Sequence, residues 1–170
     1  MHIDRYERNF IGLSTVLLIV FFLTVTIGAS ANSIRLPAPE LIVDPQMVAT
    51  PGVYEGFGDP VEERVRELSP GKYEAYIIAQ AWKFSPGSTN YGEPAITVPA
   101  GSTVTFYVTS RDIQHGFRIQ GTNISFMVLP GQVSKLTGTF DEPGTYDIVC
   151  YEYCGSAHHT MYGQVVVEDN

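Results

Sequence analysis

The N-terminal part of the chain is one uninterrupted apolar block. No charged residue occurs from Asn9 to Ile34, and residues 10–31 are nearly all apolar or small. As an α-helix these residues would be about 33 Å long, enough to cross the hydrocarbon core of a bilayer. The pattern therefore predicts a short N-terminal segment at 1–9 and a transmembrane helix at 10–32.

The charges beside this block indicate its orientation. Arg5 and Arg8 precede it and only Arg35 follows closely, so the positive-inside rule places the N-terminus in the cytoplasm and the rest of the chain outside the cell membrane. A cleaved signal peptide is the alternative, because Ala29-Ser30-Ala31 resembles an A-x-A cleavage site. The apolar run is longer than the core of a usual signal peptide, which favours a retained anchor. Both interpretations export everything that follows residue 32.

Beyond the block, the hydrophobic pattern changes twice. Residues 33–70 are rich in proline and show little periodicity, which predicts a linker with one or two helical turns over Val61–Leu68. From residue 71 onward, short β-type runs alternate with Gly/Pro turns. Strands at this spacing without helices between them predict an antiparallel sandwich or barrel formed by residues 71–170. The predicted strands are Tyr73–Trp82, Ala95–Val98, Thr103–Thr109, Gly116–Gln120, Ser125–Leu129, Val133–Phe140, Thr145–Val149 and Gln164–Glu168.

Alternation within one of these runs supports the strand interpretation. Val104, Phe106 and Val108 alternate with Thr103 and Thr105, as in a strand with one buried face. Composition agrees, because only 16% of the residues are charged while Gly and Pro number 16 and 11. The net charge of −8 argues against a nucleic-acid partner, which would require a basic face. An acidic surface is compatible with solubility alone or with a basic protein partner.

The reactive side chains gather near the C-terminus. Cys150, Cys154, His158 and Met161 fall within one short run, and His115 lies upstream. Thiolate and thioether are soft donors, and with imidazole they select copper over hard cations. A blue-copper site uses one Cys, two His and a weak Met, and here a second Cys is added. The simplest inference is two coppers bridged by two thiolates, each completed by a His and a weak outer ligand, on a rigid scaffold suited to one-electron transfer.

Simpler interpretations of these residues exist. Cys150 and Cys154 could form a disulfide, since an exported domain permits one, but a disulfide requires neither the His nor the Met. A structural zinc site is disfavoured because Met is a poor zinc ligand and the spacing is not C-x2-C.

The remaining candidate ligands also have ordinary alternatives. His115 could be a loop histidine, and Met161 could fill the core, as Met127 is expected to do. One of His158 and His159 is expected to be spare, because neighbours in an extended loop point in opposite directions.

The run Cys150–Met161, with its pattern C-x-E-x-C-G-x3-H-x2-M, resembles the CuA motif of cytochrome c oxidase subunit II. The resemblance covers the whole chain. His115–Phe117, Gly121–Ile124 and Val128–Gly131 are especially similar to the B-type oxidases, a branch that also has one membrane helix. The resemblance implies a mainly β fold, a cupredoxin-like Greek-key barrel or sandwich with one N-terminal transmembrane helix.

The resemblance also implies the ligand set of a binuclear CuA centre. The two cysteines match the bridging thiolates. His115 and Met161 match the ligands of one copper, and His158 with the backbone carbonyl of Glu152 matches those of the other. In many relatives this glutamate also reaches a divalent cation through its carboxylate, but the most similar branch often has no acid there.

Three further residues match family positions outside the ligand set. Asp112 matches an acid that orients the first histidine. Trp82, the single tryptophan, matches an aromatic residue over the copper site where electrons enter; its alternative is a core aromatic at a strand end. Glu7 matches a glutamate at the cytoplasmic mouth of a proton-uptake channel; its alternative is a boundary charge beside a membrane helix.

The function implied is that of the electron-entry subunit of a haem-copper oxidase. Cytochrome c or a small blue-copper protein would deliver electrons, and subunit I, with its haems and second copper, would reduce oxygen to water and translocate protons. The other implied partner is membrane lipid, and a small single-helix accessory subunit is compatible with this assembly. Three alternative functions remain. The first is a membrane-tethered copper chaperone, which would have a thioredoxin-like fold. The others are the CuA domain of a nitrous oxide reductase, which carries a large additional domain, and a blue-copper carrier, which the second cysteine disfavours.

Overall fold

The computed structural model describes residues 4–31 and 39–169, which belong to two separate compact units. The described part of the first unit contains the helix α1 (Arg5–Ala31), whose 27 residues make it long and apolar enough, by length and composition, to cross a membrane. Thr24 and Thr26 lie within it, and each hydroxyl donates to the carbonyl oxygen four residues earlier at 2.8 Å. Their polarity is therefore satisfied inside the helix, as an apolar surrounding requires.

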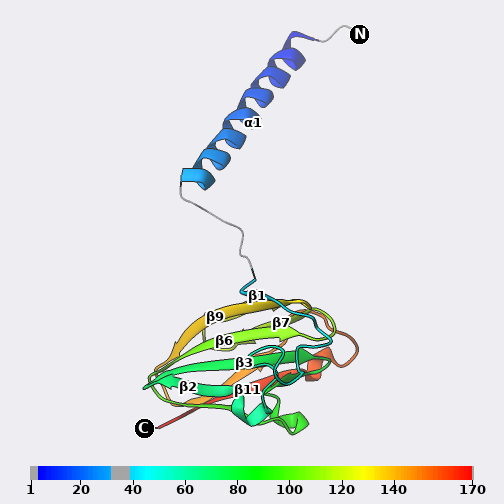
Figure 1. Ribbon diagram of the computed structural model, residues 1–170. Coiled ribbons are helices and arrows are strands. Elements are labelled where there is room, and N and C mark those ends of the chain that lie inside the picture. The colour runs from blue at the N-terminus through cyan, green and yellow to red at the C-terminus, as the bar shows by residue number, and fades with distance from the viewer. Residues whose placement is uncertain (1–3, 32–38, 170) are drawn as a thin grey trace. The chain divides into compact units, whose positions relative to one another are not determined.

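The second unit is a sandwich of two β-sheets (Figure 1). The first sheet has the strand order β1-β9-β6-β3-β2, with β4 added beside β3, and the second has the order β5-β11-β10-β7-β8. The strands are β1 (Leu41–Ile42), β2 (Val65–Ser69), β3 (Lys72–Gln80), β4 (Lys83–Ser85), β5 (Ile96–Pro99), β6 (Ser102–Ser110), β7 (His115–Ile119), β8 (Ser125–Val128), β9 (Gln132–Phe140), β10 (Gly144–Val149) and β11 (Tyr162–Glu168). Short 3-10 helices occur at Val61–Glu63, Thr89–Tyr91 and His158–Thr160.

The core forms where the inner faces of the two sheets meet. Val104, Phe106 and Val108 of β6 are fully buried, which confirms the predicted alternation. On the opposite face, the Thr103 and Thr105 hydroxyls hydrogen-bond to threonines of β9 at 3.1 and 3.0 Å. Because each strand turns its apolar residues inward, the two sheets bury one continuous core.

The predicted mainly β sandwich is confirmed, but its antiparallel pairing is wrong for two strand pairs. β3 pairs with β6 and β5 pairs with β11 in parallel. After β4 the chain adds β5 to the second sheet and then returns to the first sheet as β6, beside β3. Such a crossover brings the chain back in the same direction, so the neighbouring strands are parallel.

Residues 39–70 differ from the predicted linker. β1 pairs with β9, and Val43, Val48 and Phe57 are buried in a second apolar cluster against side chains of β3 and β9. The helical turns predicted over Val61–Leu68 shrink to the 3-10 turn, after which β2 pairs with β3. The linker was predicted because residues 33–70 lack a periodic hydrophobic pattern. Val43, Val48 and Phe57 are nevertheless buried because they contact strands that are distant in the sequence. The rest of the predicted linker, residues 33–38, lies outside the described residues.

Candidate metal centre

The cysteine-containing segment is a loop whose two ends are held together by the β10–β11 ladder. Val149 at the end of β10 lies opposite Tyr162 at the start of β11. Directly beyond this pair, the amide of Cys150 donates to the carbonyl oxygen of Met161 at 3.3 Å. Two sulfur-bearing residues that are separated in the sequence therefore lie side by side at the base of the loop.

β7 brings the upstream histidine to the same place, because β7 is the other neighbour of β10. His115 is the first residue of β7 and is fully buried, so it is not an exposed loop histidine. A ring nitrogen of His115 and the Sγ atoms of Cys150 and Cys154 all lie within 4.8 Å of one another. The structure thus joins a residue of one strand and two residues of a loop into one cluster.

The sulfur atoms lie at distances compatible with shared metal ligation. Cys150 Sγ and Cys154 Sγ are 3.7 Å apart, and Cys154 Sγ lies 3.6 Å from Met161 Sδ and 3.4 Å from His158 Nδ1. Both cysteines are free. Their separation exceeds the roughly 2.05 Å of a disulfide bond. Since metal–thiolate bonds are about 2.3 Å long, both sulfurs can reach one ion.

His115 supplies the clearest test of whether these residues fit a metal. Its Nε2 atom is hydrogen-bonded to Asp112 Oδ1 at 2.8 Å, which places the proton on Nε2. Its Nδ1 atom is buried and makes no hydrogen bond within the described residues. An orphaned buried nitrogen is costly, whereas a lone pair held ready by a carboxylate on the far side of the ring is the usual arrangement of a metal-bound histidine.

The electrostatics of the cluster also favour a bound cation. Burial alone raises the pKa of the Cys150 thiol, but contacts with His115 and the Gly116 amide outweigh it, so that this pKa is lowered. Burial and the adjacent Cys150 sulfur raise the pKa of Cys154. Ionisation of Cys150 is therefore favoured, whereas ionisation of Cys154 is opposed. A bound soft metal ion supplies the positive charge that would stabilise both thiolates.

The other predicted site residues lie around the sulfur pair. Cys150 Sγ lies 3.2 Å from the carbonyl oxygen of Glu152, while the Glu152 carboxylate accepts from Gln114 at 3.3 Å. His159 is exposed, as expected of the spare member of the histidine pair. Met127 is 44% exposed, so its predicted core position is wrong, because β8 is an edge strand and this side chain lies on its outer face.

Trp82 and Glu7 lie in very different surroundings. Trp82 is half-buried in the turn between β3 and β4, and its Nε1 donates to the carbonyl oxygen of Cys154 at 3.0 Å. It therefore belongs to the surroundings of the sulfur cluster. Glu7 is exposed in the first turn of α1, and its proposed role in proton uptake stays a prediction.

Sequence reasoning missed the contribution of Gly116. Its amide donates to Cys150 Sγ at 3.4 Å. A Cβ at this position would lie 2.6 Å from the Tyr151 ring and 2.8 Å from the Glu152 backbone nitrogen. Only glycine lets the loop approach β7 this closely. Its place directly after a candidate ligand was the only available signal.

Replacing Gly116 with alanine is expected to displace the loop, because the clashing backbone atom cannot rotate away. Overpacking of this kind costs about 1–3 kcal/mol, so we expect a lower melting temperature of the metal-free chain and a weaker copper signal. Gly138→Ala is the control: its Cβ would meet the Ile124 side chain at 2.4 Å, outside the loop. That variant should lose stability without a changed copper spectrum, and an unchanged spectrum in Gly116→Ala would contradict the prediction.

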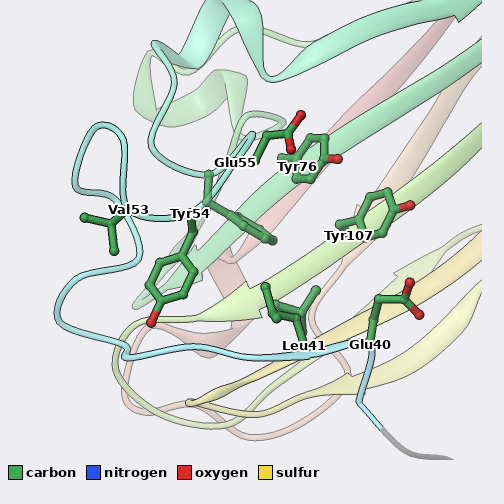
Figure 2. A pocket seen from close by; sticks show the side chains of 9 residues that line it. Glu40, Leu41, Val53, Tyr54, Glu55, Tyr76 and Tyr107 are labelled. Carbon is green, nitrogen blue, oxygen red and sulfur yellow. The ribbon is translucent and has the colours of Figure 1, made fainter.

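A separate cavity of about 310 Å³ lies over the first sheet, and Figure 2 shows carboxylates at two of its edges. These acids are already paired, Glu40 with Lys135 at 2.9 Å and Glu55 with Arg66 at 3.0 Å. The lining offers no thiol, thioether or imidazole, so this cavity is not the metal site. The lining residues are Glu40, Leu41, Val53, Tyr54, Glu55, Phe57, Tyr76, Tyr107 and Val133.

Fold and site together define a class of protein. A β-sandwich that buries two thiols and a thioether beside two imidazoles is a cupredoxin-like copper-binding domain. The sandwich excludes the thioredoxin-like fold expected of a copper chaperone.

Comparisons with known proteins agree with this class. The family "Cytochrome C oxidase subunit II, periplasmic domain" matches residues 67–169. Cytochrome c oxidase subunit 2 of Thermus thermophilus is 36% identical over 166 residues, which cover 96% of this chain and 92% of that protein. A chain from a haem-copper terminal oxidase dimer is 32% identical, with a TM-score of 0.55 and coverage of 96% of this chain and 100% of that one. The periplasmic domain of subunit II from Bradyrhizobium japonicum shares the fold at 16% identity, with a TM-score of 0.51 and coverage of 57% and 84%.

The chain belongs to the cytochrome c oxidase subunit II family. It is the electron-entry subunit of a terminal oxidase and thus one component of an oxidoreductase complex.

Proposed function

We propose that the loop 150–161 and His115 hold a binuclear CuA centre. The observation that carries the proposal is the pair of buried sulfurs 3.7 Å apart with an imidazole beside each. His115 lies in the cluster with Cys150, and His158 Nδ1 lies 3.4 Å from Cys154 Sγ. Two thiolates between two imidazoles provide symmetrical donors for two metal ions.

Each ligand has a distinct role in this proposal. Cys150 and Cys154 would bridge the metals. His115 and Met161 would complete one copper, while His158 and the Glu152 carbonyl would complete the other. When bound, the copper pair would accept and release single electrons. The protein keeps the donors in fixed positions by closing their loop with the β10–β11 ladder and by holding His115 at the start of β7, so little rearrangement would accompany each transfer.

The same proposal extends to partners and location. Helix α1 would anchor the chain in the cell membrane with residues 1–9 in the cytoplasm and the copper domain outside. Cytochrome c or a small blue-copper protein would bring electrons to the Trp82 side, and subunit I would receive them and reduce oxygen. Glu7 would collect protons at the cytoplasmic start of the helix, where an ionisable group is in contact with water.

Copper loading of the full chain in detergent tests the central claim. Two coppers per chain are expected, and the one-electron-oxidised form should give an electron paramagnetic resonance pattern from two equivalent nuclei. A single copper per chain with single-nucleus hyperfine splitting would instead identify a blue-copper or carrier site.

A further inference from the structure

The Asp112 carboxylate is hydrogen-bonded on both of its oxygen atoms. Oδ1 accepts from His115 Nε2 at 2.8 Å and from the Ile113 amide at 2.7 Å, while Ser110 Oγ lies at 3.1 Å. Oδ2 accepts from the amide of Ala81 at 2.7 Å. One oxygen therefore serves the histidine of the sulfur cluster, and the other serves the turn between β3 and β4.

The turn between β3 and β4 also contacts the loop that contains the two cysteines. Trp82 follows Ala81, and its Nε1 donates to the carbonyl oxygen of Cys154 at 3.0 Å. The indole also lies against Gly155, where a Cβ would come within 3.2 Å of Nε1. A ring nitrogen of His115 is within 4.8 Å of Cys154 Sγ, so the hydrogen bonds of Asp112 and Trp82 link two residues that already lie close together in the cluster.

We propose that Asp112 is a positioning residue that couples the His115 side of the metal site to the Trp82 side. Its role would go beyond orienting one ligand: a shift of the carboxylate would move the imidazole and also release the turn that holds the indole against the cysteine loop. The relation to copper rests on the proposed function, whereas the hydrogen bonds of Asp112 and Trp82 belong to the protein alone.

The chemistry of the side chain explains why a carboxylate is needed. Both partners, His115 Nε2–H and the Ala81 amide, are donors, and only an ionised carboxylate accepts on both oxygens. Asparagine has one acceptor oxygen, so its amide group would face either the Ala81 N–H or the imidazole. In the first orientation the turn loses its partner. In the second, the amide donates to Nε2 and moves the ring proton to Nδ1, the atom needed for the metal.

Fluorescence of the metal-free full chain tests the coupling directly, because Trp82 is the only tryptophan. Asp112→Ala removes both acceptor oxygens and should shift the emission to longer wavelength and increase acrylamide quenching about twofold, since the turn opens locally. Asp112→Asn should do the same where its amide group faces the Ala81 N–H. Asp141→Asn, at an exposed acid after β9, is the matched control and should leave both unchanged. Wild-type emission and quenching in a folded Asp112→Ala would overturn the proposal. If Asp112→Ala fails to fold, Asp112→Asn decides: wild-type fluorescence together with wild-type copper affinity would overturn the proposal, because either orientation of the amide must lose one of the two partners.

A double-mutant cycle on copper affinity supplies the second readout. Trp82→Phe removes the indole N–H donor and keeps a smaller aromatic ring, and Asp112→Asn removes one acceptor. If the two sides are coupled, the combined variant should lose less affinity than the product of the single losses. Strictly multiplicative losses would overturn the coupling. A chain that fails to bind two coppers but still shows the fluorescence response would refute the proposed function while supporting Asp112 as the link.

Discussion

Cys150→Ser is expected to eliminate the two-copper centre and leave at most one copper per chain. The Cys150 sulfur lies 3.7 Å from Cys154 Sγ and within the His115 cluster, so it is a donor that both metals would share. A serine hydroxyl is a hard, neutral donor and cannot replace a soft thiolate for copper. The measurement is copper content together with electron paramagnetic resonance of the loaded chain, in which the pattern from two equivalent nuclei should vanish.

The control for this experiment removes a sulfur elsewhere. Met127 is exposed on β8, so Met127→Leu should retain two coppers and the wild-type spectrum. Cys154→Ser should behave like Cys150→Ser, because both sulfurs are buried in one cluster. A two-copper spectrum that survives either cysteine substitution would refute the bridged centre.

Phe117→Ala is expected to lower the free energy of unfolding of the domain by about 3–5 kcal/mol. The Phe117 ring is fully buried and contacts Phe84, Phe106 and Phe126 at centroid distances of 5.5, 5.8 and 5.1 Å. Truncation would leave a cavity between the sheets that these rings cannot fill without moving their strands. Urea unfolding of the metal-free chain in detergent measures the effect.

The matched control is a truncation at an exposed position. Leu68, in β2, is 60% exposed, and Leu68→Ala should change the unfolding free energy by less than about 0.5 kcal/mol. Because His115 precedes Phe117 by two residues on the same strand, weakened copper retention is expected together with the lost stability. A loss below about 1 kcal/mol for Phe117→Ala would show that the core repacks around the missing ring.

The linker prediction missed two features of residues 39–70, and the two have different physical causes. Val65–Ser69 carries a weak strand pattern, and the turn Pro70-Gly71 after it was the signal for the β2–β3 hairpin. Val48 and Phe57 carry no periodic pattern, yet they are buried against the outer face of distant strands. The local hydrophobic pattern predicts which residues form a helix or a strand. It does not predict which surface of the sheet another part of the chain will cover.

The sequence by itself determined the apolar helix, most of the strands and the soft-donor set, because each depends on side-chain types at short spacing. A charge-free run specifies a helix that can cross a bilayer, alternation specifies strands, and Cys150, Cys154, His158 and Met161 belong to one loop whatever the fold. Only the tertiary structure decided which distant residues meet that loop: β7 brings His115 and Gly116 to it, and the β3–β4 turn brings Trp82. These encounters depend on strand order and register between sheets, which are set by the packing of the whole core and are not encoded in any one segment.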